Sequence, residues 1–348
     1  MHADHDETKY ATTVARSYGL NHIVERMDGS EIQSALRLPQ IFDEPFGDSS
    51  ALPCIRLMEL ARKHVTVALS GDGGDELFAG YRRYGFHLRE EAIRAAVPLS
   101  IRKSVFGTLA RAYPQLDWMP RPLRARHTFR ELSLDSVMGY FWNVSVVDDD
   151  LRRQLFSPEL RRELGGYTAA EVVRAAFAAA PSDDPLTRAQ YVDIKTWLPG
   201  DILTKVDRTA MASSLEVRVP MLDHLFVEWA LGLPAALKCA GGRSKIVLKK
   251  AFERLTPAEV LYRPKQGFTA PLAMWFRGTL GDRLGHELRN GLGLLNSGLF
   301  DDVTVNRLLD QHRSGLHDHS RPLWLLWMFH RFLTDVDVAS ARRMPEVA

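Results

Sequence analysis

The chain has 348 residues, of which 45% are hydrophobic and 25% are charged, and its formal net charge is +2. These values are typical of a globular protein large enough for two hydrophobic cores, and they give no support for nucleic acid or an acidic membrane surface as the main partner. The most hydrophobic segment, residues 323–329, is too short to span a membrane and predicts a buried helix near the C-terminus.

The N-terminal part of the chain predicts helices that alternate with strands. Apolar residues at helical spacing predict a helix over residues 7–18. Short apolar runs predict strands over residues 22–25 and 65–69, and two further helices are predicted between them, over residues 30–39 and 53–63. This order of elements is a fragment of a parallel sheet with crossover helices.

The fragment holds too few strands for a parallel sheet that helices cover on both faces, and it begins with a helix where a doubly wound fold begins with a strand. We therefore expect missing strands upstream. We also expect an exposed apolar edge on the strand over residues 65–69, which favours aggregation or association, including a homodimer. On this basis residues 1–85 form a partial α/β subdomain and residues 86–348 a mainly helical part.

The most informative segment follows this strand. Residues 70–76 read Ser-Gly-Asp-Gly-Gly-Asp-Glu, and residues 77–81 are expected to open a helix. A strand, a glycine-rich turn and a helix bring backbone N–H groups close to a nucleotide. The carboxylates of Asp72, Asp75 and Glu76 would repel phosphate, so they fit a site in which Mg²⁺ lies between them and the phosphates.

Other interpretations of this turn remain open. The carboxylates could hold a cationic amine or accept a proton, or the segment could be a surface turn with acidic residues at a helix start. For Glu76 in particular, the alternative is a favourable interaction with the helix dipole.

The rest of the chain is predicted to be helical, with helices over residues 89–96, 101–112, 151–163 and 169–180 and proline-containing breaks between them. Two cysteines far apart in the sequence indicate structural thiols in a reduced compartment, with a catalytic thiol as the alternative. The polar first ten residues do not resemble a secretory signal, so we expect a cytoplasmic protein.

Charged residues cluster at three further places. The first cluster precedes a helix and comprises Asp201, Lys205, Asp207 and Arg208. It forms either buried ion pairs or, as the resemblance described below implies, one wall of an amino-acid cleft. The second group is Glu216 and Arg218, which would line the same cleft. The planar guanidinium of Arg218 suits a carboxylate ligand. The third group either caps a helix or closes over the substrate, and comprises Asp48, Ser49 and Ser50.

Two lysine-containing segments are candidates for phosphate contacts. Lys265 lies in a Pro-Lys-Gln-Gly-Phe loop, and Lys245, Lys249 and Lys250 are expected on one helix, with the first two on one face. Lys245 could support a phosphate, whereas Lys250 is expected to be solvated.

Four blocks of this sequence resemble the synthetase domain of glutamine-hydrolysing asparagine synthetases, in the family's order. They are residues 43–53, 70–81, 205–223 and 263–268. The resemblance implies an α/β fold, the remnant of a parallel nucleotide-binding sheet of the adenine nucleotide alpha-hydrolase type, followed by a mainly helical region. It also implies ATP and Mg²⁺ as cofactors, and a reaction in which aspartate is activated as β-aspartyl-AMP and ammonia then forms the amide.

The resemblance also implies roles for individual residues. Asp72 and Lys265 are the expected catalytic residues: Asp72 stands where many relatives carry a longer Glu, and Lys265 matches the lysine at the leaving pyrophosphate. Asp75 and Glu76 are the expected metal ligands. The expected cofactor-binding residues are Ser70, Gly71, Gly73 and Lys245, and the expected substrate-binding residues are Asp48, Ser49, Asp207, Arg208, Glu216 and Arg218.

The chain departs from the family pattern at its beginning. The first phosphate loop of the family, Ser-Gly-Gly-x-Asp-Ser, does not occur, and neither does the N-terminal glutaminase domain with its cysteine nucleophile. The chain therefore looks like an N-terminally shortened synthetase domain acting on aspartate or a related carboxylate and ammonia. The alternatives are a non-catalytic homologue and an amidotransferase that acts on a polysaccharide or a secondary metabolite.

Overall fold

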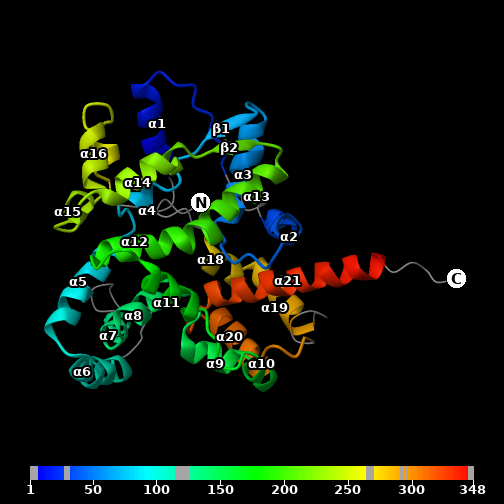
Figure 1. The fold of residues 1–348 in the computed structure, drawn as a ribbon. Helices are drawn as coiled ribbons and strands as arrows, with labels where there is room; N and C mark the ends of the chain where they lie inside the picture. Colours follow the sequence, from blue (N-terminus) through cyan, green and yellow to red (C-terminus); the bar gives the residue numbers. More distant parts are fainter. Residues whose placement is uncertain are drawn as a thin grey trace.

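The computed structural model describes residues 7–26, 32–113, 125–263, 270–290, 294 and 297–343. Most of the described chain is helical (Figure 1). The first helices are α1 (Thr8–Ser17), α2 (Ile32–Ile41), α3 (Ala51–Arg62), α4 (Gly74–Leu77), α5 (Arg82–Ala96), α6 (Leu99–Ala112), α7 (Arg126–Leu132), α8 (Ser136–Val144), α9 (Asp149–Leu155) and α10 (Pro158–Glu163).

The later helices begin with α11 (Ala170–Ala179) and α12 (Pro185–Lys195), which lead into a π-helix, η3 (Leu198–Leu203). They continue with α13 (Thr204–Ala212), the 3₁₀ helix η4 (Pro220–Leu222), α14 (His224–Gly232), α15 (Ala235–Lys238), α16 (Ile246–Phe252), α17 (Ala258–Leu261), α18 (Leu272–Arg277), α19 (Thr279–Asn290), α20 (Asp302–Arg313) and α21 (Ser320–Arg343). The strands are β1 (Val67–Leu69), β2 (Glu216–Arg218), β3 (Cys239–Ala240) and β4 (Arg243–Ser244).

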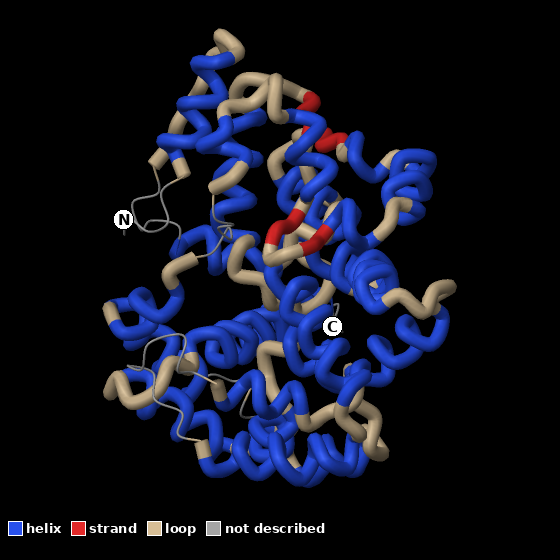
Figure 2. The backbone as a smooth tube through the Cα atoms, turned by 90° about the vertical axis from the view of Figure 1, so that its left-hand side faces the viewer, coloured by secondary structure: helices blue, strands red, loops and turns tan. Residues whose placement is uncertain are grey.

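Strand β1 pairs in parallel with β2, and its central residue Ala68 lies opposite Val217. The two short strand pairs are the only β-structure that Figure 2 shows among the described residues. The strand predicted over residues 65–69 is thus confirmed over its last three residues. The strand predicted over residues 22–25 is wrong, because this segment has no regular structure and no described strand lies beside it. Since β2 comes from residues 216–218, the sheet also extends beyond residues 1–85.

Helices α3 and α13 cover one side of this small sheet. Ala68 and Val217 pack with a cluster that includes Cys54, Met58 and Val206. The alternate residues of β1 face outward, and Leu69 is 74% exposed. Within the described residues β1 has no strand beside it other than β2, and the side chains of Val65, Val67 and Leu69 are exposed. The association expected of this strand stays a prediction.

Most of the predicted helices are confirmed, but three expectations need correction. The helix predicted over residues 151–163 is two helices, because Ser157 caps α10 and Pro158 at its first position cannot donate a backbone hydrogen bond. Residues 77–81 do not open a helix, since α4 ends at Leu77. Lys245 does not share a helix with Lys249; it precedes α16 with a left-handed backbone (φ +54°).

Two larger cores are formed between helices, and both include residues from the first 85 of the chain. One is built by α2, α3 and α18–α21 around Trp324 and Trp327, whose rings meet edge to face with centroids 5.8 Å apart. The hydrophobic segment near the C-terminus is therefore a buried helix, as predicted. The other core joins α5, α8, α11 and α12 around Tyr84 and Phe177 (Figure 1).

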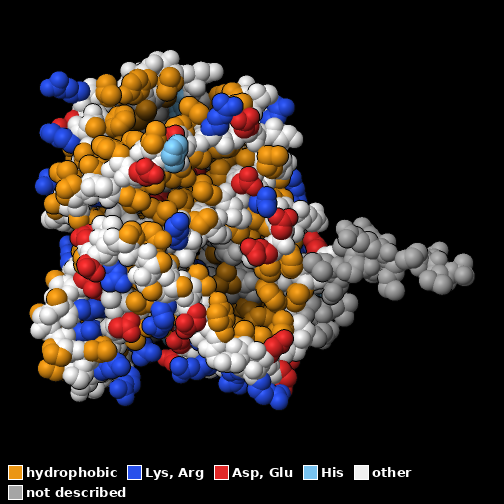
Figure 3. Space-filling model, in the orientation of Figure 1, with side chains coloured by type: hydrophobic (Ala, Val, Ile, Leu, Met, Phe, Trp, Pro, Cys, Tyr) orange, Lys and Arg blue, Asp and Glu red, His pale blue; other side chains and the backbone are white. Residues whose placement is uncertain are grey.

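The visible face in Figure 3 carries hydrophobic side chains in its upper part, where Figure 1 places α14 and β1. On α14, Leu225 is 65% exposed and Trp229 is 52% exposed. None of the described helices combines the length and the apolar character that crossing a membrane requires. Both cysteines, Cys54 and Cys239, are free thiols.

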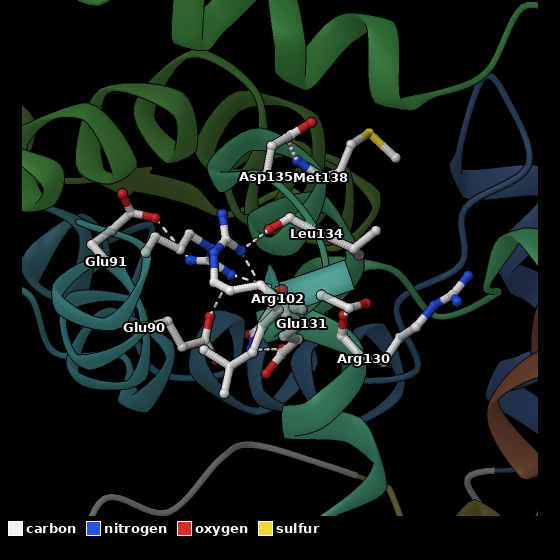
Figure 4. Close-up of polar contacts among 12 residues, drawn as sticks. Glu90, Glu91, Arg102, Arg130, Glu131, Leu134, Asp135 and Met138 are labelled. Atoms are coloured by element: carbon white, nitrogen blue, oxygen red, sulfur yellow. Dashed lines mark hydrogen bonds and ion pairs between the residues drawn. The ribbon is translucent and has the colours of Figure 1, made fainter. Parts of the chain in front are cut away.

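A buried charged network joins α5, α6 and α7 (Figure 4). Arg102 of α6 donates to the backbone carbonyls of Leu132 and Leu134, each at 2.6 Å. Glu90 of α5 is 7% exposed and Glu131 of α7 is 3% exposed. Burial raises the pKa of Glu90 to about 8, and a hydrogen bond to Glu131 and the charge of that carboxylate add to the rise.

This network predicts a pH dependence of stability. The folded protein keeps a proton on Glu90 that the unfolded chain releases near pH 4.5, so the resulting stabilisation is complete below that pH and is lost as the pH rises through about 8. Between about pH 5 and pH 8, we expect the free energy of unfolding of the wild type to fall, relative to that of Glu90→Gln, by on the order of 3 kcal/mol. Urea unfolding at several pH values measures this difference.

The matched control is Glu171→Gln, because Glu171 is exposed and only loosely paired with Arg174 at 3.7 Å. Its pH profile should follow that of the wild type. Parallel profiles for the wild type and Glu90→Gln would contradict the prediction.

Candidate functional site

The acidic loop, residues 70–76, begins where β1 ends. The backbone N–H of Ser70 donates to the carbonyl of Arg218 at 2.8 Å, which continues the pairing with β2 into the loop. Gly73 has φ +86°, and a Cβ there would lie 2.3 Å from Leu222 Cδ2. Only glycine meets both conditions, so the loop depends on the glycine at this position.

A lysine from far along the chain reaches this loop. The Lys245 ammonium pairs with Asp75 at 2.9 Å, and both side chains are about three-quarters buried. The backbone N–H of Lys245 also donates to the carbonyl of Phe78 at 3.1 Å. Gly80 packs against the pair so closely that a Cβ would lie 1.8 Å from Asp75 Oδ1 and 2.2 Å from Lys245 Cε. The fold therefore brings together two residues expected to contact metal and cofactor.

The other two carboxylates of the loop lie in different surroundings. Asp72 accepts a hydrogen bond from the hydroxyl of Ser70. Glu76 is 1% exposed and accepts a hydrogen bond from the Tyr81 hydroxyl at 2.7 Å. Burial raises the pKa of Glu76. The carboxyl of Glu76 is thus buried inside the protein, whereas Asp72 and Asp75 are both only partly buried.

The described residues hold no group of three or more His, Cys, Asp and Glu side chains placed to bind a metal. Mg²⁺ does not require one, because it commonly uses one or two carboxylates together with phosphate oxygens and water. Asp75, which is only partly buried, supplies one carboxylate of that kind, whereas the other expected ligand, Glu76, is 1% exposed. The residues present therefore fit a magnesium ion that arrives with a nucleotide.

A second cluster lies at the start of α3 and on α13. The Lys205 ammonium contacts Asp48 Oδ2 and the Ser50 hydroxyl, each at 2.7 Å. Burial opposes ionisation of Asp48, but the charge and hydrogen bond of Lys205 outweigh it and lower the pKa of Asp48. Burial and the neighbouring Asp48 raise the pKa of Asp201 to about 7. Ser49 lies in the same turn, and its carbonyl accepts from Leu52 N–H.

Of the remaining substrate candidates, Arg208 is partly buried and the other three are exposed: Asp207, Glu216 and Arg218. Arg208 pairs with Asp43 at 2.6 Å and with Asp207 at 2.9 Å. Arg218 pairs with Glu216 at 2.7 Å on β2, beside the beginning of the acidic loop. Of the predicted cluster, Lys205 is buried, Asp201 and Arg208 are partly buried and Asp207 is exposed. Arg208 pairs with Asp43 and Asp207 and not with Asp201.

Lys265 lies outside the described residues, so its predicted role stays a prediction. Arg263, two residues before it, is described and pairs with Glu7, which precedes α1.

Sequence reasoning missed a polar group beneath the acidic loop, made by Gln190 of α12 and Lys238 of α15. Nothing in the spacing of these two residues distinguishes them from ordinary helix residues.

The chain is similar to known proteins over most of its length. The model of the asparagine synthase family matches residues 1–334. The chain belongs to the asparagine synthase family. It is 35% identical over 331 residues to the putative glutamine-hydrolyzing asparagine synthetase of Mycobacterium tuberculosis strain H37Rv, and the match covers 93% of this chain and 48% of the relative.

A second member of the family matches this chain over a similar length. Glutamine-hydrolyzing asparagine synthetase 1 of Bacillus subtilis strain 168 is 30% identical over 326 residues, which cover 93% of this chain and 49% of the relative. The glutamine-hydrolyzing asparagine synthetase of Gallus gallus is 38% identical over 107 residues, or 29% of this chain. The chain spans about half the length of the first two relatives.

Proposed function

We propose that this chain is the synthetase part of an ATP-dependent, amide-forming ligase. The carboxylate substrate is aspartate or a related acid, and ammonia supplies the nitrogen. The family match supports this proposal, as do the names of the relatives. The observation that carries it is the pairing of Asp75 with Lys245 in a glycine-rich turn at the end of a strand.

The proposed chemistry begins with two anions that must meet, a carboxylate and the α-phosphate of ATP. The backbone of Ser70, Gly71 and Gly73 would hold the nucleotide at the end of β1. Lys245 would compensate the negative charge that develops as pyrophosphate leaves, and Lys265 would act on the same group. Asp75 would hold Mg²⁺, which when bound neutralises phosphate charge.

The amino-acid end of the cleft is proposed to lie beyond Asp72. Asp72 would face the ammonium group of the acceptor, or accept a proton from the incoming ammonia. Asp48 and Ser49 at the start of α3 would border the acceptor, together with the ion pairs of β2 and α13. Glu76, which is buried against Tyr81, would support the loop and contribute to the metal site only after its carboxyl turns outward.

ATP–pyrophosphate exchange tests this proposal. We expect exchange that requires aspartate or a related acid, measured in a version of the protein extended by the first phosphate loop that the family carries. Glutamate and succinate serve as matched acids that differ in length or lack the amino group. Exchange that is equally fast without any acid, or no exchange with any of them, would contradict the proposal.

A second candidate function applies to residues 1–348 alone, namely that of a non-catalytic domain. The apolar side chains exposed on β1, which pairs only with β2 among the described residues, favour it. We expect this chain by itself to form no asparagine from aspartate, ATP and ammonium. Ammonia-dependent asparagine formation by the purified chain, detected by amino-acid analysis, would rule out this candidate.

A further inference from the structure

The underside of the acidic loop is held by two polar side chains that are completely buried. Gln190 lies on α12 and Lys238 ends α15, and each is 0% exposed. Burying an amide and an ammonium so deeply is unfavourable unless both are hydrogen-bonded. Their partners therefore indicate what the pair does.

Gln190 connects the loop to Lys238. Its Nε2 donates to the backbone carbonyls of Glu76 at 2.5 Å and Leu77 at 2.9 Å, which lie at the end of α4. Its Oε1 accepts from the Lys238 ammonium at 3.2 Å. Lys238 also donates to the carbonyl of Leu231 on α14 at 3.2 Å. The contacts form one chain from the acidic loop through α12 to α15.

The position of these contacts gives them a specific effect. The last carbonyls of a helix have no partner within the helix, and α4 is only four residues long, so it cannot hold its own end in place. Gln190 supplies the missing donors. Lys238 orients the amide of Gln190, because an ammonium can only donate and so requires the oxygen of that amide to face it.

We propose that Gln190 and Lys238 are positioning residues for the acidic loop, and that they hold Asp75 at the place where it meets Lys245. The inference rests on the proposed function for its consequence in the reaction, but it concerns the loop itself. The hydrogen bonds of Lys238 within the described part of the chain go to Gln190 and Leu231, so its proposed effect on the loop passes through Gln190.

Amide hydrogen exchange of the purified chain tests this inference. Two backbone N–H groups report on the loop: Leu77, which donates to Gly73 at 2.9 Å, and Gly80, which donates to Asp75 at 2.8 Å. We expect Gln190→Met to speed their exchange at least about tenfold and Lys238→Met to speed it less. The exchange of Val305, which lies in the C-terminal core, should stay unchanged, as should all three amides in the surface control Lys103→Met.

The double variant Gln190→Met/Lys238→Met tests whether Lys238 acts through Gln190 or stabilises the loop by independent packing. If Lys238 acts only through Gln190, the double variant should exchange no faster at Leu77 and Gly80 than Gln190→Met alone. Independent packing contributions would add instead, and additive effects would overturn the proposal. Unchanged exchange at both amides in Gln190→Met would also overturn it.

Gln190→Glu keeps the test decisive if the methionine variants fail to fold. The carboxylate retains the volume and can pair with Lys238, but it cannot donate to the carbonyls of Glu76 and Leu77. We expect this variant to fold and to exchange faster at Leu77 and Gly80, and wild-type exchange there would overturn the proposal. In the extended version, Gln190→Glu should lower kcat for ATP–pyrophosphate exchange while leaving the KM for the acceptor unchanged.

The two hypotheses can fail separately. Absence of any ATP–pyrophosphate exchange in the extended wild type would overturn the proposed function without altering the hydrogen-exchange result. If Gln190→Glu shows normal ATP–pyrophosphate exchange and unchanged amide hydrogen exchange at Leu77 and Gly80, only the positioning role is overturned.

Discussion

Asp75→Asn is expected to lower ATP–pyrophosphate exchange in the extended protein by about 100- to 1000-fold, the usual effect of removing one transition-state charge contact. The amide cannot serve Mg²⁺ as a carboxylate does, and it no longer pairs with Lys245, which lies 2.9 Å from Asp75. Lys245→Met should have an effect of similar size. Because the two side chains act as a unit, the double variant should be little worse than either single one.

Asp282→Asn is the matched control, since Asp282 forms an exposed ion pair with Arg313 on the surface of the helical part. It should leave exchange unchanged. Exchange near the wild-type rate in Asp75→Asn would contradict the assignment of this residue. Calorimetric measurement of ATP binding to Asp75→Asn in the absence of the carboxylate substrate distinguishes a loss of nucleotide binding from a loss of the chemical step.

Gly80→Ala is expected to lower ATP–pyrophosphate exchange about as much as Asp75→Asn does, although alanine adds only one methyl group. The new Cβ would lie 1.8 Å from Asp75 Oδ1 and 2.2 Å from Lys245 Cε, so the ion pair must open or the loop must shift. Such a displacement affects a residue placed at the reacting groups far more than it affects the fold. Thermal unfolding and ATP–pyrophosphate exchange, measured on the same preparation, separate the two effects.

Gly285→Ala on α19 controls for the loss of a glycine, because a Cβ there meets nothing within 4 Å. It should retain exchange and stability. An active Gly80→Ala protein would show that Asp75 and Lys245 need not be adjacent for the reaction, and the proposed site would then require revision.

Much of the helical part could be predicted from the sequence, because helix signals are local. The apolar spacing of residues 7–18 and the hydrophobic run near the C-terminus were sufficient to predict α1 and the buried part of α21. The predicted helix over residues 151–163 failed at Ser157 and Pro158, where a capping residue and a proline at the first helical position start a new helix within an otherwise continuous pattern.

The acidic loop is the clearest case of a site that local sequence can indicate. Three glycines and three carboxylates after an apolar run are enough to predict a turn with unusual chemistry. The left-handed backbone of Gly73 agrees with that expectation, since such a turn needs a residue without a Cβ.

The surroundings of that loop depend on long-range packing. Its sheet partner β2, the ammonium of Lys245 and the amide of Gln190 come from positions more than 100 residues away. Local propensity and spacing carry information over a few residues, whereas these contacts depend on how the helices pack around the sheet. The acidic turn, most of the helices and the family of the chain could therefore be inferred from its residues alone. Only the folded protein shows that Lys245 is the cation beside Asp75 and that the carboxyl of Glu76 is buried. Both facts depend on contacts between segments that are far apart in the sequence.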